Sequence, residues 1–407
     1  MAHILAQDFN AITFQGVVDF CEQKIVEGTQ LDYKQQIPKE LAKHFAAMSN
    51  QRGGLIVIGV AEDARTGLPS KWEGIAYEDK LIDQIHQFAG NVRPLPSYDV
   101  RPTDEVGGKV FVLVRINEGD APPYTVINDP TVYVRVGNTT SRFVPGPADV
   151  NVISDLFGKR ARAEAARRDN LAEANARLRV LIRQHIPRDD KPQLRASNQI
   201  TAYLQPFNPN HELALPRDIF AQLDRIRVTN NHERDFPGQQ MSPVARGMLH
   251  FQRGAGNPSF SCDQVYANGM FFHAENIVRP GKLDGKEIYL VDIGQHLYKT
   301  LLFGRKLYSQ FGYNGLTRGA VELNAPHGCI IRPMVLDDSR PQFRSDFPFT
   351  IDKSYTWPIE ADTHQLGDDG WVHDYFYERM REIYWDLGFT DVERTVLDQF
   401  VAYHRFR

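Results

Sequence analysis

Apolar residues in the first part of the chain recur with two spacings, one typical of helices and one typical of strands. Apolar positions three or four residues apart predict helices at residues 12–23, 38–51 and 77–90. Alternation or a short continuous apolar run predicts strands at residues 31–36, 55–60, 97–101, 109–116 and 131–136. Turns rich in Gly and Pro separate these segments. We therefore predict one mixed α+β domain over residues 1–147.

A long segment rich in Ala, Arg and Leu begins at about residue 148. The stretch "ISDLFGKRARAEAARRDNLAEANARLRVLIRQH" has helical spacing and no proline, which predicts a single helix ended by Pro187. Its basic residues outnumber its acidic ones. We interpret residues 148–190 as a basic helical linker, which is either a solvated connection or a helix that contacts RNA or a second subunit.

The remaining residues, 191–407, have the mixed spacing of a second α/β domain. "NQITAYLQPF" alternates as a strand does, and further strands are expected near 317–325 and 329–335. Pro216 begins a helix, and "QHLYKTLLFGRKLYSQFGY" predicts an amphipathic helix that ends near Gly312. A final helix is expected at residues 371–386. The predicted fold class is α+β, with two mixed domains joined by a long helix, and the role of the second domain is open.

Composition excludes several classes of protein. Apolar residues make up 42% of the chain and charged residues 24%, as in ordinary soluble proteins. No apolar run reaches the roughly 18 residues of a spanning helix, and the N-terminus lacks the basic segment of a secretory signal. Cys21, Cys262 and Cys329 are far apart and form no CxxC pair. This pattern predicts a cytoplasmic protein and argues against a disulfide framework or a structural zinc site.

Charge limits how the chain could bind nucleic acid. The net charge is −4, and residues 1–147 alone hold 14 Lys and Arg against 18 Asp and Glu. Binding to nucleic acid would therefore depend on a local basic patch, to which the linker helix could contribute.

The stretch "QLDYKQQ" places an acid and a base on one face of a predicted strand. Alternation directs Asp32 and Lys34 to one side and Leu31 and Tyr33 to the other. Glu27 precedes this strand. These residues are the first candidates for chemistry.

A second pair of acids, Glu62 and Asp63, follows the apolar strand "GLIVIGV". If the two strands are neighbours, Glu27, Asp32 and one acid of this pair converge at one end of a sheet. Clustered carboxylates raise one another's pKa, and a divalent cation is the usual reason for such a cluster. Oxygen ligands suit Mg²⁺ or Mn²⁺. The alternative is a set of surface ion pairs, such as Asp32 with Lys34.

Three stretches resemble the Schlafen-type (Alba-2) domain in content and in order. They are "VEGTQLDYKQQIPKELAKHFAAMSNQRGGLIVIGVAED", "KWEGI" and "VYVRVGNTTSRF", within about residues 15–145. The family has an E…EFK stretch, a helix, a GG-hydrophobic-GV strand and a YxRxGxxT strand in this order. The chain thus resembles a bacterial-like member, while vertebrate members are metal-dependent endoribonucleases that cut tRNA or rRNA with three carboxylates.

The resemblance implies roles for individual residues. Glu27 and Asp32 match the first two catalytic acids, although Glu is usual at the second position, and Lys34 matches the family's lysine. Glu62 is the preferred third acid, with Asp63 as the alternative. The implied metal ligands are Glu27, Asp32 and Glu62, and the implied ion is Mg²⁺ or Mn²⁺.

Other motifs add a candidate nucleic-acid contact and exclude some enzyme classes. In "TVYVRVGNTTSRF", Arg135 and Arg142 could hold phosphates and Tyr133 could stack on a base, or all three could belong to an ordinary hairpin. The chain has no GxxxxGK[ST] loop for ATP, no HExxH or other paired histidine spacing for a metal, and no GxSxG.

Two functions remain at this point. The first is a metal-dependent endoribonuclease that acts on structured RNA such as tRNA, with a role in antiviral defence. The second is a non-catalytic nucleic-acid-binding or regulatory protein with a C-terminal sensor domain.

The assembly is predicted from the linker helix. Only one Schlafen-like lobe is present, so a homodimer is expected to complete an RNA cradle. The bridge would be the apolar stripe formed by Leu171, Leu178, Leu181 and Ile182. The alternative is that this stripe packs against the C-terminal domain of its own chain.

Overall fold

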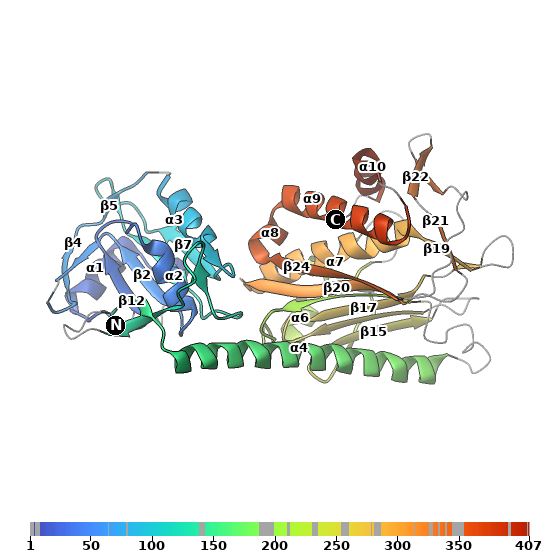
Figure 1. Cartoon of the computed structure of the whole chain (residues 1–407), viewed down its shortest axis with the longest axis horizontal. Coiled ribbons are helices and arrows are strands. Elements are labelled where there is room, and N and C mark those ends of the chain that lie inside the picture. The colour runs from blue at the N-terminus through green and yellow to red at the C-terminus, as the bar shows by residue number, and fades with distance from the viewer. Residues whose placement is uncertain are drawn as a thin grey trace. The chain divides into compact units, whose positions relative to one another are not determined.

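The structure is a computed structural model, and it divides into two compact units, Met1–Glu164 and Ala165–Arg407 (Figure 1). The boundary lies inside helix α4 (Val150–His185), within the segment predicted as a linker. The described residues are 4, 9–63, 65–78, 80–137, 143–186, 199–209, 212–229, 235–253, 260–277, 279–280, 286–313, 315–324, 329–332, 334–337, 340–343, 354–389, 392–404 and 406. The expected mixed α+β fold is confirmed.

The first unit is built on a four-stranded sheet with helices on both faces. The strand order is β1 (Leu31–Lys34), β2 (Gly54–Ile58), β9 (Val112–Ile116) and β7 (Tyr98–Pro102). β1 and β2 are parallel and are connected through α2, because parallel strands need a crossover connection, and the other neighbours are antiparallel. The strand that bears Asp32 and the strand "GLIVIGV" are therefore neighbours, which was the condition for their acids to converge.

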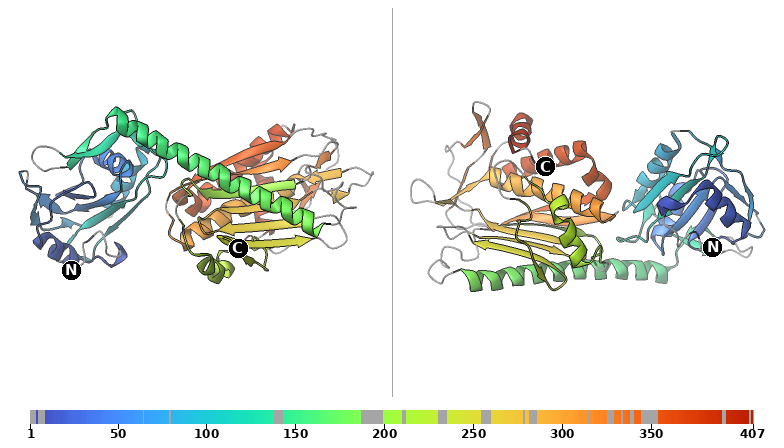
Figure 2. Two further views of the ribbon diagram at one scale, coloured as in Figure 1. Left: turned by 90° about the horizontal axis from the view of Figure 1, so that it is seen from below. Right: turned by 180° about the vertical axis from the view of Figure 1, so that it is seen from behind.

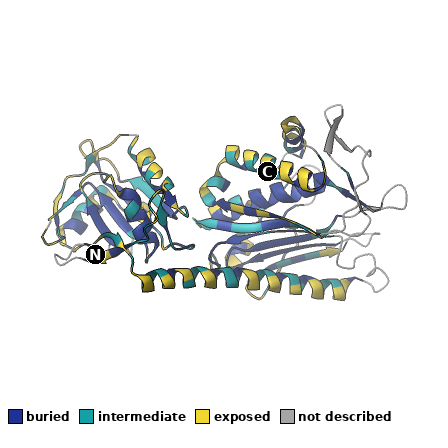
Figure 3. Ribbon diagram, in the orientation of Figure 1, coloured by how far each residue is buried: buried dark blue, intermediate teal, exposed yellow. Residues whose placement is uncertain are grey.

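Helices cover both faces because the strands alternate between two apolar cores. Side chains of α2 (Leu41–Ser49) and α3 (Lys80–Gly90) pack on the face that includes Ile56 and Ile58. α1 (Phe14–Glu22) packs on the face that includes Leu31 and Tyr33. Figure 3 shows that the buried residues of this unit are concentrated in the central strands.

Short two-stranded ladders complete the first unit. They are β3 (Val60–Glu62) with β4 (Pro69–Trp72), β5 (Ile75–Ala76) with β8 (Lys109–Val110), β6 (Val92–Arg93) with β10 (Thr125–Val126), and β11 (Tyr133–Gly137) with β12 (Phe143–Pro147). A short 3-10 turn, η2 (Phe9–Ala11), precedes α1.

The second unit contains a seven-stranded sheet in which every neighbouring pair is antiparallel. Its strands, in spatial order, are β14 (Ser242–Val244), β15 (Gly247–Arg253), β16 (Phe260–Tyr266), β17 (Phe271–Asn276), β13 (Gln199–Pro206), β20 (Leu316–Asn324) and β24 (Tyr355–Asp362). Smaller ladders contain β18 (Arg279–Pro280), β19 (Lys286–Tyr289), β21 (Cys329–Arg332), β22 (Met334–Asp337) and β23 (Arg340–Phe343).

Helices also cover both faces of this second sheet. One face bears α6 (Pro216–Ile226), α7 (Leu290–Gln310), α8 (Thr363–Gly367), α9 (Asp369–Asp386) and α10 (Arg394–His404). The part of α4 in this unit lies across the other face (Figure 2). The prediction that the helix at 371–386 is the last one is wrong, because α10 follows it. Among the described residues, no helix combines the length and apolar character needed to cross a membrane.

The apolar stripe of α4 is covered within its own unit. Leu178 is buried, and Leu171, Leu181 and Ile182 pack with it against aromatic side chains of β16 and β17. The stripe therefore has an intramolecular partner, as the second of the two alternatives expected. The homodimer stays a prediction, but this stripe no longer argues for it. Pro187, the expected end of the helix, lies outside the described residues.

Candidate functional site

Asp32 lies in the middle of β1 and is completely buried. Leu31 and Tyr33 enter the core beneath α1, so strand alternation turns Asp32 towards the opposite face, which α2 covers. A buried carboxylate is costly unless charged partners and hydrogen bonds surround it. The geometry around Asp32 therefore decides what this site can do.

Three basic side chains surround the Asp32 carboxylate. Its Oδ1 is 2.9 Å from Lys34 Nζ and 3.0 Å from Arg135 Nη1, and its Oδ2 is 3.0 Å from His44 Nδ1. Burial alone would raise the pKa of Asp32, but His44, Lys34 and Arg135 outweigh it and lower the pKa below its usual range. We refer to Asp32, Lys34, His44 and Arg135 as the Asp32 cluster.

Arg135 connects distant parts of the unit. It comes from β11, and its Nη2 donates to the backbone carbonyls of Gly28 at 3.1 Å and Leu31 at 3.3 Å. Its backbone N donates to Gln51 Oε1 at 3.0 Å. The guanidinium is fully buried, so Arg135 supports β1 in this conformation and does not present the phosphate contact that the sequence suggested.

Glu27 lies beside this cluster and is also buried. Its Oε1 accepts a hydrogen bond from the Tyr33 backbone N at 2.6 Å and is 3.8 Å from Lys34 Nζ. Burial and the Asp32 carboxylate raise the pKa of Glu27 to about 7, against the opposing effect of Lys34 and the Tyr33 hydrogen bond. Glu27 can therefore exchange a proton near neutral pH.

The structure brings Glu27, Asp32 and Lys34 together, whereas Glu62 and Asp63 follow a turn at the end of β2. β2 ends at Ile58, and Gly59 turns the chain with φ of 107°, where an added Cβ would lie 2.8 Å from Gly74 Cα. After this turn, Glu62 ends β3, which pairs with β4. Asp63 is exposed and closes a turn, because its Oδ1 accepts from the backbone N of Arg65 and of Thr66 at 2.9 Å each.

These residues do not fit a Mg²⁺ or Mn²⁺ site in this arrangement. Ligand oxygens of Glu27, Asp32 and Glu62 do not all lie within 4.8 Å of one another, although a different group among the described residues meets that distance. Asp32 Oδ1 already faces the cationic groups of Lys34 and Arg135, which repel a further cation, and Oδ2 faces His44 Nδ1. Binding of either ion at these acids stays a prediction, and no chemical step is derived from it.

The other predicted contact residues have separate outcomes. The Tyr133 hydroxyl donates to Asp129 Oδ2 at 2.6 Å, and Lys43 Nζ lies 5.4 Å from the centre of the Tyr133 ring. The ring is partly exposed. Arg142 lies outside the described residues.

No signal in the sequence indicated His44, because its contact with Asp32 depends on how α2 packs over β1.

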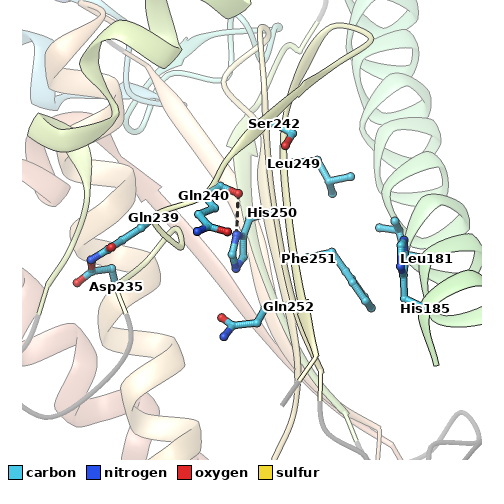
Figure 4. Close-up of a pocket in the computed structure, with 10 residues that line it drawn as sticks. All are labelled: Leu181, His185, Asp235, Gln239, Gln240, Ser242, Leu249, His250, Phe251 and Gln252. Carbon is cyan, nitrogen blue, oxygen red and sulfur yellow. Dashed lines mark hydrogen bonds between the residues drawn. The ribbon is translucent and has the colours of Figure 1, made fainter. Parts of the chain in front are cut away.

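No signal in the sequence indicated a cavity of about 670 Å³ at the β14–β15 edge of the second sheet (Figure 4). The cavity is lined by Leu181, His185, Asp235, Gln239, Gln240, Ser242, Leu249, His250, Phe251 and Gln252. His250 Nδ1 hydrogen-bonds the Gln240 carbonyl at 2.8 Å. Polar residues scattered over several segments gave no common spacing that could have indicated this cavity.

The first unit is thus a small mixed α+β domain in which buried ion pairs hold β1, α2 and β11 together. Residues 27–144 match the family model described as Schlafen, AlbA_2, and the unit contains a Schlafen-type domain of this nucleic-acid-related family. The match includes the Asp32 cluster and Glu27. Comparison with curated proteins finds no match for the chain.

Proposed function

We propose that the Schlafen-type domain binds nucleic acid, RNA in the first instance, through a face that contains Lys34, Lys43 and Tyr133. The observation that carries the proposal is the Asp32 cluster, because it fixes the three elements that bear these residues. Lys34 is 19% exposed and is held by Asp32. Lys43 and Tyr133 belong to α2 and β11, which His44 and Arg135 bind to the same carboxylate.

This face offers two kinds of contact to a nucleic acid. The ammonium groups of Lys34 and Lys43 suit phosphate oxygens, although Lys43 also pairs with Glu40 at 2.7 Å. The Tyr133 ring, oriented by Asp129, suits stacking on an unpaired base. Because residues 1–147 have more acidic than basic side chains, binding depends on this local face and not on the charge of the whole domain.

Replacement of Tyr133 by Ala should weaken binding of single-stranded RNA at least fivefold, because stacking contributes about 1–3 kcal/mol per base. Lys43→Gln should weaken binding less and lower the salt dependence by about 0.7 in the logarithmic slope. Fluorescence anisotropy with labelled RNA at several salt concentrations measures both effects.

Lys109→Gln is the matched control, because Lys109 is an exposed lysine paired with an acid, Glu73, as Lys43 is with Glu40. Equal losses in Lys43→Gln and Lys109→Gln would place binding elsewhere. An absence of RNA binding by the full chain at low salt would refute the proposal.

A metal-dependent endoribonuclease acting on structured RNA such as tRNA is the second candidate function. One observation favours cleavage of RNA, although it does not bear on the metal: Glu27, with a pKa raised to about 7, lies 3.8 Å from Lys34 Nζ. A carboxyl that titrates near neutral pH suits general acid–base chemistry, and an ammonium beside it suits a phosphate in the transition state. The Schlafen-type match supports the same candidate.

Under this candidate, purified protein with Mn²⁺ should cleave tRNA, and a chelator should stop the cleavage. Lys34→Ala should lower the rate at least about 100-fold, because the lost charge acts on the transition state. Gel analysis of labelled tRNA measures the rate. Intact tRNA after incubation with wild-type protein and Mn²⁺, under conditions where binding is detected, would exclude this candidate and leave the binding function standing.

A further inference from the structure

Two histidines and a glutamate meet beneath α7 in the second unit. His273 and Glu275 are two residues apart on β17, so both side chains point to the same face of the sheet. Phe271, two residues earlier on that face, belongs to the core under α7. His296 lies in the second turn of α7, which covers this face (Figure 1). A strand and a helix that are separated in sequence thus supply one group of side chains.

The three side chains converge through single atoms. His273 Nε2 and His296 Nε2 are 3.0 Å apart, and Glu275 Oε2 is 3.5 Å from the first and 3.2 Å from the second. Both imidazoles are buried. Atoms that are bound to one tetrahedral zinc ion at about 2.0–2.1 Å lie about 3.3 Å apart. The observed separations therefore have the size that a shared ion requires.

The other nitrogen of each imidazole, Nδ1, already makes a hydrogen bond. His273 Nδ1 is 2.6 Å from Asp263 Oδ1, and His296 Nδ1 is 2.6 Å from the Asp292 backbone carbonyl. A carbonyl and a carboxylate only accept hydrogen bonds, so each Nδ1 donates its proton outward. Asp263 is itself held in place, because its Oδ2 accepts from the Gly238 backbone N at 2.9 Å.

This tautomer leaves lone pairs facing one another. With Nδ1 protonated on both rings, each neutral imidazole directs an Nε2 lone pair at the other ring and at the Glu275 carboxylate. Three acceptors at about 3 Å repel one another unless a positive species lies between them. That species is either an extra proton shared by the two rings or a metal ion.

We propose that His273, His296 and Glu275 bind one divalent transition-metal ion, with Zn²⁺ preferred, and leave one coordination position open. Two imidazole nitrogens and one carboxylate oxygen form a ligand set that suits Zn²⁺ better than Mg²⁺ or Ca²⁺. Asp263 and the Asp292 carbonyl are the outer partners that fix ring orientation at metal sites.

The site has an entry path for an ion, and its open coordination position could bind a further ligand. The Glu275 side chain is 36% exposed, whereas the two rings are buried, so an ion can arrive from the Glu275 side. The fourth position would hold water or a small anionic or carbonyl ligand. This gives the second unit a chemistry of its own, independent of nucleic-acid binding by the first.

The test uses the full chain, first stripped with a chelator and then titrated with Zn²⁺ or Co²⁺. We expect about one ion per chain after gel filtration, a visible absorption band with Co²⁺, and a rise in melting temperature with Zn²⁺. His273→Gln, His296→Gln and Glu275→Gln should each weaken Zn²⁺ binding at least tenfold. Asp263→Asn should weaken it about 10–100-fold, as outer partners do. Titrations with Fe²⁺ and Mn²⁺ should give weaker binding than Zn²⁺.

His250→Gln is the matched control. His250 is as buried as His296, pairs with Asp263 across β15 and β16, and is bound through Nδ1 to a carbonyl, but it contributes no atom to the cluster. If a histidine variant fails to fold by circular dichroism, Glu275→Gln decides, because its partly exposed side chain tolerates the change. Zn²⁺ binding that is absent in the wild type, or equal in Glu275→Gln and His250→Gln, overturns the proposal and assigns the cluster to a shared proton.

Discussion

Arg135→Ala should destabilise the first unit by about 3–5 kcal/mol, because it removes one partner of a buried ion pair and leaves the other in place. Asp32 would keep Lys34 and His44 but would lose the guanidinium at 3.0 Å, and the carbonyls of Gly28 and Leu31 would lose a donor. Two compact units are not expected to unfold in one transition, so the measurement should resolve them. Hydrogen exchange of peptides from β1 and α2, read by mass spectrometry, does so.

Arg115→Ala is the matched control for this prediction. Arg115 pairs with Asp99 at 2.6 Å on the same sheet, but the pair is exposed, and its loss should cost less than about 1 kcal/mol. Arg135→Lys should fall between the two, since it keeps the charge and loses the forked geometry. An Arg135→Ala protein as protected from exchange as Arg115→Ala would show that the Asp32 cluster does not hold the unit together.

Local patterns predicted many individual elements. β2 is a continuous apolar run between a Gly turn and Gly59, and α2 and α7 have clear helical stripes. The antiparallel order of the second sheet was not predicted, because pairing between strands depends on contacts that are distant in sequence. α10 was missed for a related reason: its apolar face is defined by the core that it covers.

The residues of the candidate site also differ in whether the sequence could place them. Glu27, Asp32 and Lys34 could be placed together because they lie within one short segment. His44 and Arg135 could not be added, since α2 and β11 reach Asp32 only through tertiary packing. The sequence alone suggests that Asp32 is an available carboxylate. In the structure it is already paired with three basic side chains, which include His44 and Arg135.

The cluster beneath α7 shows a signal that was present but not used. HExxH is the spacing of a helix, whereas His273 and Glu275 are related by the period of a strand. Their partner, His296, lies on a different element and could not be assigned from spacing alone. A His-x-Glu pair in an apolar strand is therefore only a weak indication of a metal site. A further ligand from a helix that covers the strand is needed as well.

The stability of the first unit should fall as the pH rises from about 4.5 to 7, and Glu27→Gln should remove this fall. Because the folded state raises the pKa of Glu27 from 4.5 to about 7, it binds more protons than the unfolded state across this window. Its stabilising effect is complete at pH values below the pKa of the unfolded state and is lost as the pH rises through the pKa of the folded state. A shift of this size corresponds to about 3 kcal/mol. At pH 8, Glu27→Gln should thus be more stable than the wild type, as hydrogen exchange of β1 peptides can measure.

The pKa of Asp32 shifts in the opposite direction from that of Glu27, so the two carboxyls affect stability in different pH ranges. Its pKa is lowered in the folded state, so its contribution is present above its ordinary value and is lost as the pH falls below it. Glu27→Gln should therefore keep the acid-side loss of stability while it removes the loss near neutral pH. Glu22→Gln, an exposed change on α1, should leave the whole profile unaltered. A Glu27→Gln protein that is less stable than the wild type at pH 8 would mean that the ionised carboxylate supports Lys34 more than its burial costs.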